Sequence, residues 1–146
     1  MKEMDRLSSE LLFEIQKAFY DERGRGARYR VTTVGLSYMN SAHPGCFSSL
    51  ENVKKALFES GMVEKINLKE EDVSVTAEVE GCYFKKLRDR FISAGMQPLS
   101  CPIANIIMQA LERKTGLSPE LLPITAEGTR CLVTMAKQAS ADIVKE

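Results

Sequence analysis

Apolar positions in the first half of the chain follow two periods, one helical and one extended. A four-residue spacing predicts a first helix that ends before Gly24, and its expected buried stripe is Leu7, Leu11, Ile15 and Phe19. A capping box from Ser48 to Glu51 predicts a second helix that ends at Gly61. Strict alternation over 72–80 predicts a strand whose apolar face is Val73, Val75, Ala77 and Val79. Ile66 and Leu68 predict a neighbouring strand.

The second half of the chain predicts two more helices and a hairpin. The third helix is indicated by Phe84, Leu87 and Phe91 and ends at Gly95; its expected solvent-facing residues are Lys85, Lys86, Arg88 and Arg90. The fourth helix begins at Pro102, and its expected buried stripe is Ile103, Ile106, Ala110 and Leu111. Glu127-Gly128-Thr129-Arg130 is typical of a type II′ turn. Its register places Ala126 opposite Cys131, Ile124 opposite Val133 and Leu122 opposite Met135.

The order of these elements indicates an α+β fold, with helices packed on one antiparallel sheet of about four strands. Residues 28–35 have the composition of a strand but no clean period, so they are either a short strand or a loop. A chain of 146 residues without repeats or a long linker is expected to form a single domain over 1–146, with a hydrophobic core.

Charge and cysteine usage narrow the class of protein. Lysine and arginine number 20, equal to aspartate and glutamate, so no net field attracts nucleic acid or an anionic membrane. The sequence has no apolar run long enough for a signal peptide or a membrane span, and we expect a cytoplasmic protein. Its four cysteines include no CxxC pair and are expected to be reduced thiols.

Candidate chemistry converges on the cysteines. Cys101 precedes Pro102 at a helix start, where free amides and the helix dipole would lower the thiol pKa and make Cys101 a nucleophile, with His43 as its base. Packing as a small buried residue explains the same position equally well. Cys82, at the junction of a strand and a helix, has the same two interpretations, whereas Cys131 is expected in the core.

Two further groups are candidate ligand sites. His43 and Cys46 lie three residues apart in a turn-forming sequence, and Cys82, Cys101 and Cys131 are candidates to complete a tetrahedral zinc or iron site. Structural zinc sites usually contain closely spaced cysteine pairs, which this chain lacks. The arginine cluster consists of Arg23, Arg25, Arg28 and Arg30, which would bind a carboxylate or phosphate, or simply face solvent at a helix end.

Residues 70–136 resemble the 4-vinyl reductase domain family, relatives of vesicle-trafficking subunits. The matching features are Gly81-Cys82-Tyr83-Phe84 after a strand, Cys101-Pro102-Ile103 opening a helix, and Glu127-Gly128-Thr129-Arg130-Cys131 before a strand. The resemblance implies an antiparallel sheet, a homodimer, and an apolar or tetrapyrrole-like ligand, in some members with a cysteine-bound metal. The cysteine spacing is also similar to that of the L-2-amino-thiazoline-4-carboxylic acid hydrolase family, which would make the cysteines catalytic.

Three functional hypotheses follow. The first is a domain that binds or senses a small hydrophobic molecule between helices and sheet, with Phe84, Ile106, Arg28 and Arg30 contacting the ligand near the thiols. The second is a hydrolase or other thiol enzyme that uses Cys101 and His43. The third is a non-catalytic subunit that serves as a dimerisation platform.

Overall fold

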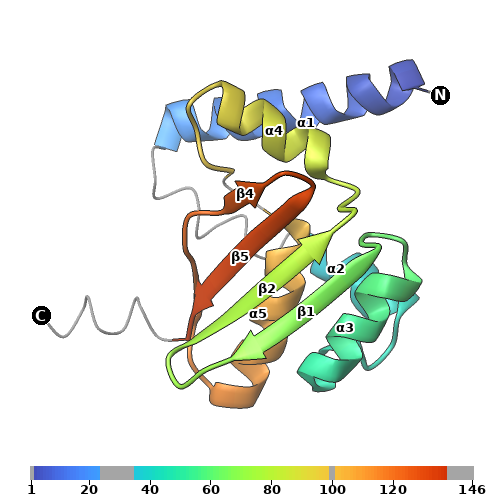
Figure 1. The fold of residues 1–146 in the computed structure, drawn as a ribbon, viewed down its shortest axis with the longest axis vertical. Helices are drawn as coiled ribbons and strands as arrows, with labels where there is room; N and C mark the ends of the chain where they lie inside the picture. Colours follow the sequence, from blue (N-terminus) through green and yellow to red (C-terminus); the bar gives the residue numbers. More distant parts are fainter. Residues whose placement is uncertain (1, 24–34, 99–100, 138–146) are drawn as a thin grey trace, which may run out of the picture.

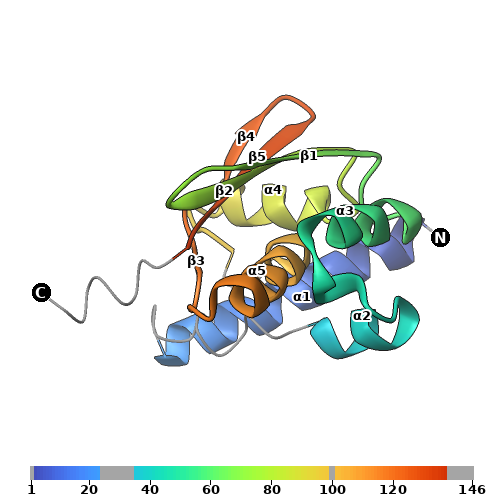
Figure 2. The ribbon, with the colours of Figure 1, turned by 90° about the horizontal axis from the view of Figure 1, so that it is seen from below.

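The computed structural model describes residues 2–23, 35–98 and 101–137. Within these ranges, one antiparallel sheet has helices against one of its faces (Figure 1, Figure 2). The helices are α1 (Lys2–Arg23), α2 (Leu36–Ala42), α3 (Leu50–Glu59), α4 (Lys85–Ser93) and α5 (Pro102–Thr115), with a 3-10 turn η2 (Cys46–Ser48). The strands are β1 (Lys65–Glu70), β2 (Ser74–Glu80), β3 (Glu120–Leu121), β4 (Thr125–Glu127) and β5 (Arg130–Ala136). The predicted α+β class is confirmed.

The sheet is built around β2 and β5, which are its longest strands. β1 pairs with β2, β2 with β5, and β3 and β4 both pair with β5. The inward faces of β2 and β5 alternate as their sequences require; the buried residues are Val75, Ala77, Val79, Cys131, Val133 and Met135. Val73, predicted to belong to this face, lies before β2 and is exposed.

The C-terminal hairpin has the predicted turn, but its register shifts farther from the turn. Ala126 pairs with Cys131 as predicted. Met135, however, pairs with Leu121, so the predicted Leu122 pairing is wrong. One extra residue lies between β3 and β4, where Pro123 has no amide to donate to the ladder. Ile124 lies in this interruption, and its amide donates to Gln97 Oε1 (3.0 Å).

The start of α3 differs from the prediction by one residue. Ser49, not Ser48, is the N-cap, and its hydroxyl accepts the Asn52 amide at 3.1 Å. Ser48 instead donates its hydroxyl to the Gly45 carbonyl at 2.8 Å, in the turn that precedes the helix. Serine at either position would satisfy an amide of the first turn, and the local geometry selects the second.

The core lies between the sheet and α5, which runs behind the sheet in Figure 1. The predicted α5 stripe is confirmed, and Ile107 and Met108 are buried as well. A helix that is buried nearly all round must be covered on more than one side. Both α3 and η2 pack against α5 in addition to the sheet, and this explains the apolar surroundings of α5.

The predicted buried stripe of α1 is wrong at three of its four positions, and the fourth, Phe19, is half-buried. Leu7, Leu11 and Ile15 are exposed, whereas Phe13 is buried against α4. The Phe13 and Phe91 rings pack edge to face with their centroids 4.9 Å apart. The periodicity predicted the helix correctly, but the side of α1 that is buried against α4 is opposite to the predicted one. No helix in the described ranges is both long and apolar enough to cross a membrane.

Two lysines form ion pairs with Glu70 of β1, and these ion pairs link β1 to α5 and to the end of β5. Glu70 accepts hydrogen bonds from Lys114 (2.8 Å) and from Lys137 (2.9 Å). These bonds hold the pKa of the Glu70 carboxyl below its usual value. Because the folded-state pKa is depressed, the stabilisation is present at neutral pH and is lost as the pH falls through that pKa.

We predict that Glu70→Gln lowers the free energy of unfolding by about 1 kcal/mol at pH 7, because two partly exposed ion pairs are lost. The difference from the wild type should vanish in acid. Urea denaturation between pH 3 and pH 7 measures both effects. Glu59→Gln is the control, since Glu59 forms a long, exposed ion pair with Lys55, at 3.9 Å. An equal effect of the two substitutions at pH 7 would contradict the prediction.

Candidate functional site

Three of the four cysteines line one cavity at the end of the sheet nearest α4. Its volume is about 30 Å³. Val79 and Val133 form its floor on the sheet, and Phe84 and Leu87 form the wall on the α4 side. The three thiols belong to Cys82, Cys101 and Cys131, which are far apart in sequence. The lining is therefore almost wholly apolar, and its most polarisable atoms are the three cysteine sulfurs.

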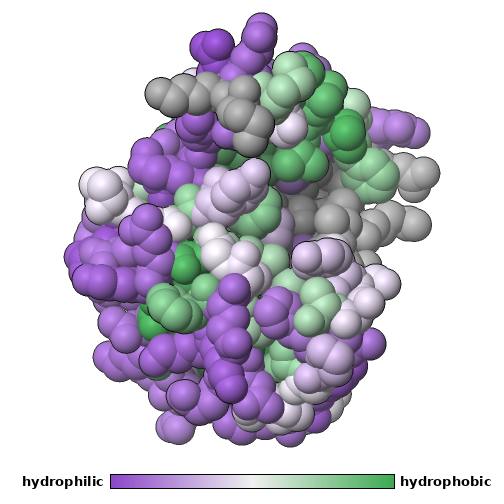
Figure 3. All heavy atoms as spheres, turned by 90° about the vertical axis from the view of Figure 1, so that its right-hand side faces the viewer, coloured by the Kyte–Doolittle hydropathy of each residue, from purple (hydrophilic) through white to green (hydrophobic). Residues whose placement is uncertain are grey.

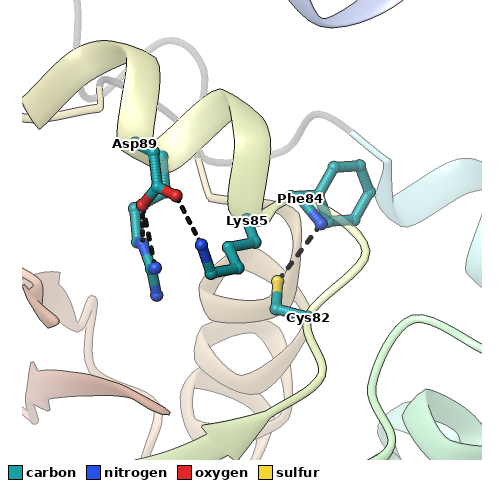
Figure 4. Close-up of polar contacts among 5 residues, drawn as sticks. Cys82, Phe84, Lys85 and Asp89 are labelled. Carbon is teal, nitrogen blue, oxygen red and sulfur yellow. Dashed lines mark hydrogen bonds and ion pairs between the residues drawn. The ribbon is translucent and has the colours of Figure 1, made fainter. Parts of the chain in front are cut away.

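Each cysteine reaches the cavity through a different local feature. Gly81 has a φ of 66° and turns the chain out of β2, so that Cys82 lies beneath the start of α4. The Cys82 sulfur accepts the Phe84 amide at 3.3 Å (Figure 4). Cys101 is the N-cap of α5, as predicted. Cys131 lies on the inward face of β5 and pairs with Val79 of β2.

Arg88 also lines the cavity, although its position in the sequence did not predict this. It was predicted to face solvent, and that prediction is wrong: only 7% of the residue is exposed. The sequence does contain a signal, because position 88 lies one turn from both Phe84 and Phe91 and so shares their face of the helix. A long side chain can bury its stem there while its charged end finds a partner.

The partner of Arg88 is Asp89, at the edge of the cavity. Arg88 Nε and Nη2 donate to Asp89 Oδ1 at 3.1 and 2.9 Å, and Lys85 Nζ donates to Oδ2 at 2.7 Å (Figure 4). Burial disfavours the charged form of Arg88, but hydrogen bonds to the Cys131 sulfur and to Asp89 outweigh it and raise the Arg88 pKa. Arg88 therefore stays a cation in contact with a thiol.

Burial makes two of the cavity thiols, those of Cys82 and Cys101, harder to ionise. It raises the pKa of Cys101 to about 12, although the amides of Ala104 and Ile103 act in the opposite direction. The Cys101 side chain makes no regular cap hydrogen bond, so these amides stabilise the thiolate only weakly. Burial likewise raises the pKa of Cys82 to about 11. The predicted lowering of the Cys101 pKa is wrong, because desolvation exceeds the effect of the helix start.

His43 and Cys46 lie elsewhere, around a separate surface hollow between α2 and α3. Cys46 is buried, its thiol donates to the Met39 carbonyl at 3.8 Å, and burial raises its pKa. The structure thus brings Cys82, Cys101 and Cys131 together but does not bring His43 to Cys101. Among the residues with described positions, no three histidine, cysteine or acidic side chains are arranged to hold a metal ion. The cavity in this conformation does not fit the predicted zinc or iron.

The other predicted ligand contacts divide into three groups. Phe84 lines the cavity, as expected. Ile106 is buried in the main core and is not part of the lining. Arg28 and Arg30, together with Arg25, lie outside the described residues.

Comparisons with known proteins provide no family for the chain. No family model matches it, and it has no significant match among curated proteins or solved structures. The similarity to 4-vinyl reductase domains stays a prediction from a few residues. The interpretation of the site therefore rests on its geometry and chemistry.

We predict slow alkylation of Cys101. A pKa of about 12 makes its thiolate scarce at pH 7.5. The fraction of Cys101 present as thiolate is then roughly 3,000-fold smaller than for an ordinary thiol. A thiolate with a higher pKa is intrinsically more nucleophilic, which offsets part of this difference. We therefore expect Cys101 to be labelled about 100-fold more slowly than an ordinary thiol. Peptide mass spectrometry after timed iodoacetamide treatment measures the rate, with the urea-unfolded chain as reference. Rapid labelling of Cys101 below pH 7 would show that the thiol is activated.

We predict that removing the partner of Arg88 costs more stability than replacing the arginine itself. Asp89→Ala leaves a buried guanidinium with fewer acceptors and should cost roughly 1–2 kcal/mol, since Asp89 is partly exposed. Arg88→Met keeps the apolar stem and should change stability by less than about 1 kcal/mol. Chemical denaturation of both variants tests the order, and the reverse order would argue against a buried charge at this site.

Proposed function

We propose that this domain binds a small, mainly apolar molecule in the thiol cavity, as a carrier or sensor of that molecule. The observation that carries the proposal is the lining: apolar side chains and three thiols surround a small space beside one buried arginine. Such a site gains affinity from removing apolar ligand surface from water, at roughly 25 cal/mol per Å². Arg88 lines the same space, and its cationic end would orient a polar group of the ligand.

The size of the cavity limits the ligand. A volume of about 30 Å³ accommodates little more than a water-sized group. A tetrapyrrole is much larger, and sites for drug-sized ligands span roughly 300–1,000 Å³. The proposal is therefore for a small ligand, and any larger molecule would require α4 and α5 to separate. Because the gain from so little buried surface is small, we expect weak binding, with a Kd of tens of micromolar or higher.

Thiol catalysis has less support from the same geometry. A nucleophilic cysteine needs a lowered pKa or an adjacent base. Burial raises the Cys101 pKa to about 12, and His43 lies around a different hollow. Thiols that stay protonated are instead suitable as an apolar, polarisable lining.

The test is a pair of matched substitutions in the sheet. Val133→Ile adds one methyl group to the cavity floor, whereas Val75→Ile adds it to the same buried face outside the cavity. Xenon and dichloromethane serve as probe ligands, because each is apolar and close to the few-atom size that the cavity admits. At ten times its Kd, a probe should raise the Tm of the wild type by about 4 °C. Val133→Ile should reduce the response at least about tenfold, because the added methyl occupies the ligand's space.

The Tm of each variant without ligand is its own baseline, so a change in intrinsic stability does not obscure the result. The proposal requires Val75→Ile to keep the wild-type response. If neither probe shifts the wild type at saturation, or if Val133→Ile binds as tightly as the wild type, the thiol cavity is not the binding site.

A further inference from the structure

The most apolar side of α1 faces away from the other parts of the chain that the structure describes. Its exposed residues are Met4, Leu7, Leu11, Leu12 and Ile15, with exposed fractions between 44% and 64%. The inward side of the same helix buries only Phe13 fully. Figure 3 shows hydrophobic side chains gathered on the surface near the end of the molecule where α1 and α4 lie. Contiguous apolar surface of this kind marks an interaction site more often than isolated exposed residues do.

The spacing of this stripe is symmetric about Leu11. Leu7 and Ile15 lie four residues before and after it, and Met4 and Ala18 lie seven residues before and after it. Ala18 is exposed as well. All five positions fall on one side of an α-helix. A stripe that reads the same in both directions is what a helix needs to pack antiparallel on an identical helix.

We infer that α1 binds α1 of a second copy of this chain, antiparallel, about a two-fold axis at Leu11. Leu11 then contacts its own equivalent, Leu7 lies opposite Ile15 of the second copy, and Met4 lies opposite Ala18. Every apolar position of the stripe thus meets another apolar position. A partner of different sequence would need an apolar stripe but would impose no such symmetry. The inference is independent of ligand binding.

The contact area indicates a weak dimer. A 22-residue helix is about 33 Å long and about 10 Å wide, so one side offers on the order of 300 Å². Stable complexes bury roughly 800 Å² on each partner. We therefore expect a dimer that forms at tens to hundreds of micromolar and dissociates on dilution, rather than an obligate dimer.

Sedimentation velocity over a concentration series tests the association. The wild type should shift from the mass of one chain towards twice that mass as its concentration rises to several hundred micromolar. Leu11→Glu places two like charges at the two-fold axis and should abolish the shift. Phe58→Glu is the matched control, because Phe58 is 61% exposed on α3, away from α1. This control should dimerise like the wild type.

Engineered disulfides test the orientation. In the antiparallel pair, a cysteine at position 11 meets its own equivalent, so Leu11→Cys should form a crosslinked dimer under mild oxidation. Equivalents of residue 4 lie about 21 Å apart along the axis, beyond the reach of a disulfide. Met4→Cys alone should therefore not crosslink, whereas mixing Met4→Cys with Ala18→Cys protein should give the mixed dimer.

Three results would overturn the inference. A wild type that stays monomeric at several hundred micromolar would assign the stripe to a different partner. Equal effects of Leu11→Glu and Phe58→Glu would show that association does not use α1. Crosslinking of Met4→Cys to itself as fast as Leu11→Cys would show a parallel pair.

Discussion

The burial of the inward face of β2 and β5 against α5 is the interaction on which the fold and the site both depend. The three elements share the main core, and the register of β2 with β5 places Val79 beside Cys131. Where this core meets the start of α4, it leaves a small space lined by thiols. The site is therefore the edge of the core itself, not a separate cleft on the surface.

That origin explains the chemistry of the thiols. Excluding water from the core raises the cost of a negative charge, so burial determines the pKa of Cys82 and Cys101 more than any single neighbour does. The start of a helix would lower the pKa of an exposed cysteine, but at Cys101 this effect is smaller than the effect of burial. Arg88 is tolerated in the same surroundings because its charged end pairs with Asp89 at the cavity edge.

Local patterns in the sequence were enough to predict most elements of the fold. The alternation in β2, the glycine turn before β5 and the proline at the start of α5 all predict the structure correctly, because each depends on neighbouring residues. Contacts between distant elements were not predictable in the same way. Periodicity alone could not show that α1 packs through Phe13 instead of its leucine stripe, or that Arg88 is buried.

The site was predicted only in part, because local patterns in the sequence do not show which distant residues meet. Separate local signals marked Cys82, Cys101 and Cys131, and the structure brings these three together. Their grouping with His43 and Cys46 assumed a contact that the sequence cannot encode locally, and that pair lies around another hollow. The sign of the Cys101 pKa shift depended on how deeply the thiol is buried, which only the assembled core determines.

Native mass spectrometry of freshly purified, reduced protein, beside elemental analysis for zinc and iron, tests most directly whether the cavity thiols form a neutral ligand site. We expect far less than one equivalent of either metal and the mass of the metal-free, reduced chain, with any bound small molecule lost on gentle activation. One equivalent of zinc or iron, retained by the wild type and lost when Cys82, Cys101 or Cys131 is replaced by serine, would contradict this expectation and make the cavity a metal centre.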